Sequence, residues 1–148
     1  MTAKERALAM LDRRDYSRAE LLKKLVEKGE DEMEAAAAVE RLAELGFVDD
    51  ARYAPIIVRH YAAKGYGPRR VRQELQRRGI PKELWDEAME QMPEQNDTID
   101  RLLRSRLKSE SPDRAELKKA QDFLLRKGYG WEEIKSAIDR YNSEIEDS

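Results

Sequence analysis

Apolar residues recur three and four positions apart along the whole chain, with charged residues between them. Alternating apolar and polar runs of strand length are absent, and the strong helix formers Ala, Leu, Glu, Lys and Arg dominate. Glycines, prolines and capping residues interrupt the pattern often enough to predict nine helices in an all-α protein. We expect these helices at residues 3–14, 17–29, 31–45, 51–64, 68–78, 81–92, 98–108, 111–127 and 131–143, with the last five residues frayed.

A glycine returns in the same helical context at an interval near fifty residues. The segments Leu-Val-Glu-Lys-Gly, Leu-Gln-Arg-Arg-Gly and Leu-Leu-Arg-Lys-Gly end at Gly29, Gly79 and Gly128, which are 50 and 49 residues apart. Glycine adopts the left-handed conformation that often ends a helix, so each copy marks the end of a middle helix. This regularity predicts three tandem three-helix repeats at residues 1–48, 49–93 and 94–148.

A second alignment competes with the fifty-residue interval. The segment Lys-Gly-Tyr-Gly occurs at residues 64–67 and again at residues 127–130. Alignment on this segment would match the ninth helix with the fifth. We prefer the fifty-residue interval because it leaves three helices in every copy. At the level of sequence both the second alignment and a plain nine-helix bundle with coincidental similarity stay open.

Capping signals mark several helix ends. Ser17 followed by Glu20 at the third helical position predicts a capping box. Asp49 and Asp50 directly precede a predicted helix, so capping explains this acidic pair better than metal binding or acid–base chemistry.

Apolar residues at other helix ends predict local packing. Phe47 or Val48 is expected to fold back over the last turn of the helix before it. Trp85 and Trp131 lie near the starts of two predicted helices, and we interpret both as anchors of local packing.

The composition gives little support to enzyme chemistry. The 148 residues include no cysteine and one histidine, His60, which excludes thiolate sites and leaves no second imidazole for a metal. No glycine-rich phosphate loop is present, and no apolar run approaches the ~20 residues of a membrane span. We therefore expect a cytoplasmic protein that is not an enzyme and has no cofactor, metal or membrane partner.

The net charge of −2 conceals an uneven distribution along the chain. Residues 1–50 hold nine Lys or Arg against thirteen Asp or Glu, and residues 93–148 hold eleven against thirteen. Residues 51–92 hold nine against five, so the middle repeat is basic.

The fifth predicted helix concentrates this positive charge on one face. At 100° per residue Pro68, Val71 and Leu75 share a narrow packing face, and the opposite side is cationic and rich in glutamine. Guanidinium groups suit phosphates and carboxylates, so the face is a candidate for binding nucleic acid or an acidic protein surface. The predicted binding residues are Lys64, Tyr66, Arg69, Arg70, Arg72 and Arg77. A merely solvated charged face is the alternative.

Tyr66 lies in the turn that precedes this helix. Its ring would either plug the turn, which we favour, or stack on a base.

These residues form part of a longer pattern that resembles the RecX regulatory proteins. The pattern comprises Leu-Asp-Arg-Arg-Asp-Tyr-Ser at residues 11–17 with Glu20-Leu21, Leu-Gly-Phe-Val-Asp-Asp-Ala-Arg-Tyr-Ala at 45–54, Lys-Gly-Tyr-Gly-Pro-Arg-Arg-Val-Arg-Gln-Glu-Leu at 64–75, and Arg-Gly-Ile at 78–80. The resemblance covers nearly the whole chain and is stronger in the first two repeats than in the third.

The resemblance implies three tandem three-helix repeats in a bent, elongated molecule. It also implies a non-enzymatic bacterial modulator that binds the RecA recombinase in its filament on DNA. Such a protein restrains filament growth, ATP hydrolysis, strand exchange and repressor cleavage, and we expect it to be a monomer. A DNA-binding protein built of helix-turn-helix-like units is the alternative. An enzyme acting at Asp49 and Asp50 is a third alternative.

Overall fold

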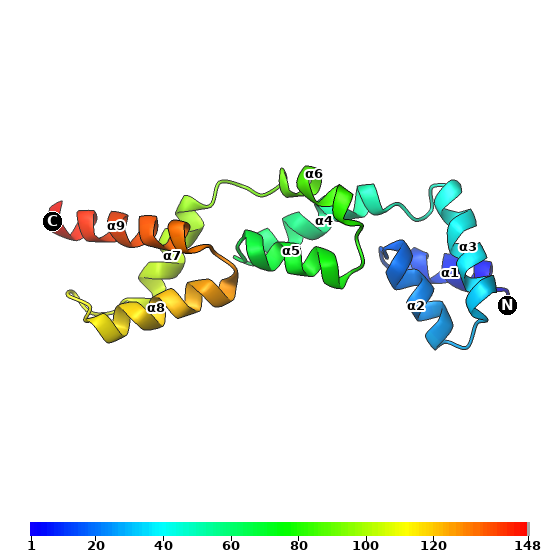
Figure 1. Cartoon of the computed structure of the whole chain (residues 1–148), viewed down its shortest axis with the longest axis horizontal. Helices are drawn as coiled ribbons and strands as arrows, with labels where there is room; N and C mark the ends of the chain where they lie inside the picture. The colour runs from blue at the N-terminus through cyan, green and yellow to red at the C-terminus, as the bar shows by residue number, and fades with distance from the viewer. Residues whose placement is uncertain (148) are drawn as a thin grey trace. The chain divides into compact units, whose positions relative to one another are not determined.

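The computed structural model describes residues 1–147 and contains α-helices without β-strands in that range (Figure 1). The helices fall into three successive groups of three, which confirms the predicted all-α tandem repeat. They are α1 (Ala3–Arg13), α2 (Arg18–Glu27), α3 (Glu32–Glu44), α4 (Asp50–Ala63), α5 (Pro68–Arg77), α6 (Trp85–Met89), α7 (Asn96–Arg106), α8 (Arg114–Lys127) and α9 (Trp131–Asp147), with a short 3₁₀-helix η1 (Lys82–Leu84) before α6.

The chain folds as two compact units. Among the described residues, the first comprises 1–58 and 74–90, and the second comprises 59–73 and 91–147. Helices α4 and α5 therefore each contribute residues to both units.

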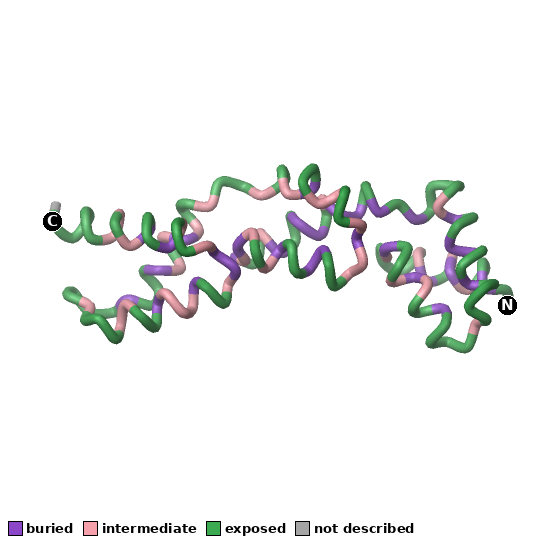
Figure 2. Tube along the Cα trace, in the orientation of Figure 1, coloured by how far each residue is buried: buried purple, intermediate pink, exposed green. Residues whose placement is uncertain are grey.

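In the first unit, α1, α2 and α3 pack around an apolar core (Figure 2). Leu21, Leu25 and Leu42 are fully buried in this core. Val48 is also buried, whereas Phe47 is 53% exposed, so Val48 is the residue that folds back over the end of α3.

In the second unit, α7 packs against both α8 and α9. The buried residues of this core include Leu103, Leu124, Ile134 and Tyr129. Arg140 of α9 donates three hydrogen bonds of 2.8–3.1 Å to the Asp100 carboxylate of α7 and so ties the two helices at the surface.

The recurring glycine ends the middle helix of each group in the same way. Gly29, Gly79 and Gly128 have φ of 98°, 74° and 100°. In each case the glycine N–H donates to the carbonyl three residues back, and the next N–H donates to the carbonyl five residues back. This is the Schellman pattern, which satisfies carbonyls that the helix leaves unpaired. The same pattern ends α3 at Gly46 and α4 at Gly65, so the glycine alone does not identify a middle helix.

Capping residues determine where several helices begin. Ser17 and Glu20 form the predicted capping box at α2. Asp49 accepts a hydrogen bond of 3.2 Å from the Arg52 amide, which confirms its capping role at α4. Asp50 instead accepts a hydrogen bond of 2.9 Å from the Arg18 amide at the start of α2.

Some predicted boundaries and packing roles were wrong. Helix α6 ends at Met89 rather than 92, and the turn before it is the 3₁₀-helix η1. Helix α8 begins after Asp113, which caps it, rather than at Ser111. Trp85 donates its indole N–H to the Ile80 carbonyl at 2.9 Å and is an anchor as predicted, but Trp131 is 51% exposed.

The predicted fraying of the last five residues is also wrong for most of them. Helix α9 continues from the expected end at 143 through Asp147, and Ser148 lies outside the described residues.

Candidate functional site

Helix α5 has the two faces that its sequence predicts. Pro68 is its first residue, and Val71 and Leu75 are fully buried. Arg69 and Arg72 are exposed on the helix. A proline at the first position and an apolar residue every third or fourth position explain both the start of the helix and its orientation.

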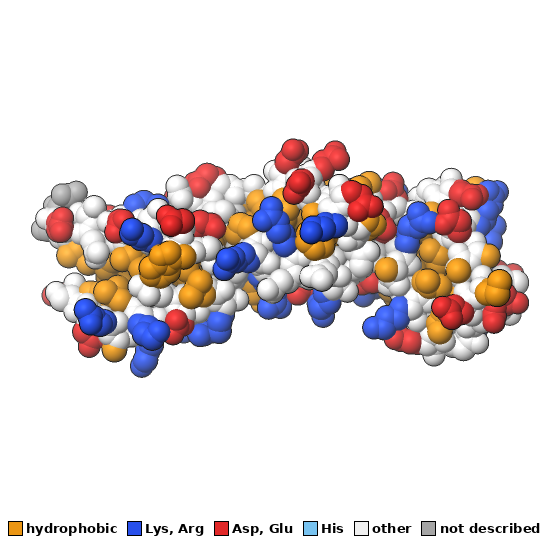
Figure 3. Space-filling model, in the orientation of Figure 1, with side chains coloured by type: hydrophobic (Ala, Val, Ile, Leu, Met, Phe, Trp, Pro, Cys, Tyr) orange, Lys and Arg blue, Asp and Glu red, His pale blue; other side chains and the backbone are white. Residues whose placement is uncertain are grey.

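Arg69 and Arg72 have free guanidinium groups within the described residues. Neither side chain contacts a carboxylate in residues 1–147. Gln73, on the same helix, is also exposed. Figure 3 shows Lys and Arg side chains over the middle helices of the chain. The two arginines are therefore the residues of α5 that are best placed to bind an anionic group.

Tyr66 packs in the turn before α5 and gathers cations around its ring. The Arg70 guanidinium carbon lies 5.0 Å from the ring centroid, and the Lys127 amino nitrogen lies 4.6 Å from it. The Tyr61 ring is 6.0 Å away, and Lys64 lies over that ring at 5.6 Å. These contacts agree with the interpretation of Tyr66 as a plug, and they place Lys64 and Arg70 at aromatic rings.

The two Lys-Gly-Tyr-Gly segments dock on each other and hold the start of α5. The Gly67 amide donates to the Lys127 carbonyl at 2.7 Å, and the Arg69 amide donates to the Gly128 carbonyl at 3.0 Å. The buried Tyr129 hydroxyl donates to the Gly65 carbonyl at 3.0 Å. Burial raises the pKa of Tyr129 to about 12.

Arg77 belongs to the other unit and differs from Arg69 and Arg72. Its guanidinium nitrogens donate to one oxygen of Glu74 at 2.9 and 3.1 Å. Glu74 is the only acid of α5 and is 2% exposed. Arg77 thus contacts a buried carboxylate while most of its side chain faces solvent.

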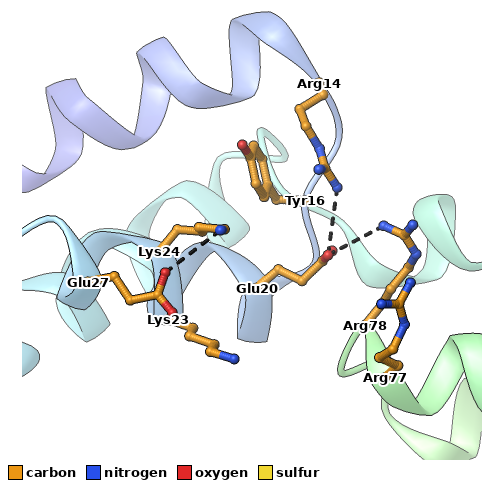
Figure 4. A pocket seen from close by; sticks show the side chains of 8 residues that line it. All are labelled: Arg14, Tyr16, Glu20, Lys23, Lys24, Glu27, Arg77 and Arg78. Atoms are coloured by element: carbon orange, nitrogen blue, oxygen red, sulfur yellow. Dashed lines mark hydrogen bonds and ion pairs between the residues drawn. The ribbon is translucent and has the colours of Figure 1, made fainter.

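Arg77 and Arg78 also line a pocket of about 370 Å³ in the first unit (Figure 4). Five cations face two carboxylates there. The lining residues are Arg14, Tyr16, Glu20, Lys23, Lys24, Glu27, Arg77 and Arg78. Glu20 lies 3.7 Å from Arg14 and 3.5 Å from Arg78, and Glu27 lies 3.7 Å from Lys24. Each acid already has a partner, so the pocket keeps an excess of positive charge.

The Ser17 cap of α2 connects two segments that line this pocket, the start of α2 and Arg78. The Ser17 hydroxyl accepts from the Glu20 amide at 3.0 Å and donates to the Arg78 carbonyl. Arg78 also donates to the Tyr53 hydroxyl at 3.0 Å. Burial raises the pKa of Tyr53, and the nearby Glu20 carboxylate raises it further.

The sequence predictions did not include Arg14, Lys23 and Lys24 in a binding site. The sequence does contain two pairs of basic residues, at 13–14 and 23–24, that could have indicated this pocket. The net charge of the first fifty residues conceals them, because this segment carries more acids than bases.

The remaining chemical candidates have structural explanations. Asp49 caps α4, and Asp50 accepts a hydrogen bond from the Arg18 amide at the start of α2. The His60 ring packs edge-on against Tyr61 at 5.0 Å. Within residues 1–147 there is no group of three His, Cys, Asp or Glu side chains that could hold a metal ion. No helix in the described part of the chain is long and apolar enough to cross a membrane.

Comparison with family models matches all three helical groups. The models are described as the first, second and third three-helix domains of RecX, and they match residues 3–42, 49–89 and 94–138. Regulatory protein RecX of Stenotrophomonas maltophilia is 40% identical over 143 residues, covering 95% of this chain and 87% of the relative. Regulatory protein RecX of Xanthomonas oryzae pv. oryzae is 39% identical over 140 residues, covering 92% and 86%.

Solved structures agree with these matches. The crystal structure of RecX from Lactobacillus salivarius has a TM-score of 0.84 at 22% identity, covering 95% of this chain and 94% of that one, and bears on the fold alone. A crystal structure of regulatory protein RecX also has a TM-score of 0.84, at 25% identity, covering 93% and 71%. The sequence matches span all three helical groups of the chain, which belongs to the RecX family of regulatory proteins.

Proposed function

We propose that this protein binds the RecA recombinase in its filament on DNA and restrains ATP hydrolysis, strand exchange and repressor cleavage by the filament. The observation that carries the proposal is the match to regulatory RecX proteins along nearly the whole chain. In this proposal the protein acts in the cytoplasm as a monomer, without a cofactor and without catalysis of its own.

The proposed contact surface is the exposed side of α5 and the turn before it. Arg69 and Arg72 would bind acidic RecA side chains or DNA phosphates, since neither is engaged by a carboxylate in residues 1–147. Lys64, Tyr66 and Arg70 would flank this contact, and Arg77 would add to it from the end of the helix. Tandem repeats that touch successive filament subunits gain affinity from multivalency. Contact with adjacent subunits would block addition at a filament end or hold an inactive subunit geometry.

The test is inhibition of RecA–DNA ATP hydrolysis by the double variant Arg69→Glu/Arg72→Glu. Arg77 is left unchanged, because its substitution would also perturb the buried Glu74. Glutamate near the N-terminus of α5 suits the helix dipole, so helicity is retained. We expect the concentration for half-maximal inhibition to rise about tenfold or more, which corresponds to about 1.4 kcal/mol of lost binding.

A matched control carries the same change of charge elsewhere in the same unit. Lys118 of α8 and Lys135 of α9 are exposed and contact no carboxylate in residues 1–147. The variant Lys118→Glu/Lys135→Glu should inhibit as the unchanged protein does. Undiminished inhibition by the folded α5 variant would refute this contact surface, and no inhibition by the unchanged protein would refute the function.

Direct DNA binding is the second candidate function. The exposed Gln73 and Gln76 beside the arginines favour it, because amides can bind base edges. Fluorescence anisotropy of labelled DNA at two salt concentrations, with and without RecA, separates the candidates. Affinity for free DNA that equals affinity for the filament and falls steeply with salt would favour the DNA-binding function.

A further inference from the structure

The third helical group has a cationic pocket of its own, of about 380 Å³. It lies within the second unit, between the end of α7, the loop that follows and one face of α8. The lining residues are Ser105, Arg106, Lys108, Lys119, Asp122, Phe123 and Arg126. The other three α8 residues follow Lys119 at intervals of three, four and seven positions, so all four project from one side of that helix.

The cations of this pocket are not neutralised by neighbouring acids. Arg106, Lys108, Lys119 and Arg126 are exposed, and none of their side chains contacts a carboxylate in the described part of the chain. Asp122 is the only acid among the lining residues. The first unit's pocket differs, because both of its carboxylates are ion-paired there. Positive charge is therefore concentrated and available in the third helical group.

The loop that presents Lys108 is held in place. The amides of Lys108 and Ser109 both donate to one oxygen of Glu116, at 2.9 and 3.2 Å. Leu107, just before them, is buried in the core of the group. The loop on this side of the pocket is thus fixed by contacts that do not use the cationic side chains.

A flat cationic surface adjoins these charges. The Arg106 guanidinium carbon lies 3.8 Å from the centroid of the Phe123 ring, which is half-buried. This cation–π contact places the guanidinium over the ring, and the exposed Arg106 side chain remains accessible to solvent. A guanidinium plane of this kind is a surface on which nucleobases stack.

We propose that this pocket binds a nucleotide, with the base on Arg106 and the phosphates on Lys108, Lys119 and Arg126. A volume of about 380 Å³ lies in the range of small-molecule sites, roughly 300–1,000 Å³. Several uncompensated cations within one concavity favour a phosphate chain over a single carboxylate. The aromatic layer favours a nucleotide over an inorganic polyphosphate. The inference is independent of RecA binding.

The experiment follows amide chemical shifts by NMR while the full chain is titrated at constant ionic strength. The probes are ATP, inorganic tripolyphosphate, adenosine and a short single-stranded oligodeoxynucleotide. ATP should shift amides at residues 105–109 and 119–126, tripolyphosphate should bind the same residues more weakly, and adenosine should bind least. If ATP and the oligonucleotide shift these amides equally at equal phosphate concentration, the pocket recognises the nucleotide unit that both contain. If one of the two binds clearly more tightly, the natural ligand is a free nucleotide in the first case or single-stranded nucleic acid in the second.

Two variants test the separate roles of charge and stacking. Lys119→Ala/Arg126→Ala should weaken ATP and tripolyphosphate alike by about tenfold, whereas Lys118→Ala/Lys135→Ala should change neither. Arg106→Lys keeps the charge but removes the planar group, so it should weaken ATP about fivefold and leave tripolyphosphate within about twofold. ATP shifts that match those of added chloride, or an ATP affinity that is unchanged in the Lys119→Ala/Arg126→Ala variant, would overturn the proposal. Equal effects of Arg106→Lys on ATP and tripolyphosphate would overturn the role of stacking.

Discussion

Replacing Gly67 by alanine should open the joint between the two Lys-Gly-Tyr-Gly segments. A Cβ atom at Gly67 would lie 2.7 Å from the carbonyl carbon and oxygen of Gly128 and from the Tyr129 amide nitrogen. These are backbone atoms, which cannot move without shifting the end of α8. Gly130 holds the matching position of the second segment, and a Cβ atom there would meet only the tip of the Glu133 side chain, at 3.1 Å. Gly130→Ala is therefore a control with the same local sequence and the same chemical change.

The expected cost follows from the contacts at the joint. Overpacking of this kind costs about 1–3 kcal/mol. The Gly67 and Arg69 amides donate to the Lys127 and Gly128 carbonyls at 2.7 and 3.0 Å, and loss of each bond costs about 0.5–1.5 kcal/mol. Gly67→Ala should thus lower the free energy of unfolding of the second unit by about 2–6 kcal/mol, the sum of these ranges. Gly130→Ala should cost at most about 0.5–1.5 kcal/mol, because the Glu133 oxygen that the new methyl group meets also accepts a hydrogen bond of 3.1 Å from the residue 130 amide and has to shift slightly.

Native-state hydrogen exchange measures this difference at the joint itself. The amides of residues 67 and 69 should exchange faster in Gly67→Ala by the factor that corresponds to the lost free energy, at least about thirtyfold. The same amides should keep their exchange rates in Gly130→Ala. Urea unfolding followed by circular dichroism gives a second measure of the free energy of unfolding. The two units can unfold in separate transitions, so the curve is fitted with one transition for each unit. Equal losses of stability in the two variants would refute the role assigned to the Gly67 contact.

Three further predictions concern single buried polar groups. Ser17→Ala removes both a helix cap and the donor to the Arg78 carbonyl, so it should lower the free energy of unfolding in urea by about 2–4 kcal/mol. Thr2→Ala, at an exposed cap without a second hydrogen bond, should lower it by about 1 kcal/mol. Burial raises the pKa of Tyr129 to about 12, so stability should be intact below pH 10 and fall by up to about 1.4 kcal/mol per pH unit between about pH 10 and 12. That fall should be absent from the stability curve of Tyr129→Phe, and an unchanged alkaline slope in this variant would contradict the buried hydroxyl. Burial also raises the pKa of Asp50, so the stability of the unchanged protein should fall as the pH rises above 3.8 and the Asp50 carboxyl ionises. Asp50→Asn keeps the acceptor oxygen and does not ionise, so its stability should not fall in this way. Parallel stability curves of the two proteins from pH 3 to 7 would contradict this prediction.

Local features of the fold could be predicted from the sequence because short-range physics decides them. The apolar spacing located the helices, and Ser17 with Glu20 located the start of α2. Predictions failed where two local signals had similar strength. Ser111 and Asp113 are both good capping residues, and Asp113 is the cap of α8. Trp131 was expected to pack because tryptophan is large and apolar, yet its burial depends on neighbours that the local pattern does not specify.

Contacts between distant segments could not be predicted in the same way. The repeated Lys-Gly-Tyr-Gly segment was visible in the sequence, but only as evidence for a competing alignment. In the structure its two copies contact each other, and the absence of a side chain at Gly67 is what permits the approach. A repeated motif can therefore reflect two surfaces that meet rather than two equivalent positions in a repeat.

The candidate sites show why charge summed along the chain is an incomplete guide. The net charge of each repeat identifies the middle repeat as basic and so predicts a binding surface at Arg69 and Arg72. The net charge of the first and third repeats does not predict the pockets at Arg14 and Arg106, because acids elsewhere in the same repeats cancel the positive charges in the sum. In space such cancellation fails beyond the screening distance of about 8–10 Å at physiological salt. A cationic pocket can thus act on an anion within a repeat whose net charge is negative. Substitutions on α5 leave the Arg106 pocket unchanged, so the α5 and pocket variants probe the two proposed functions independently.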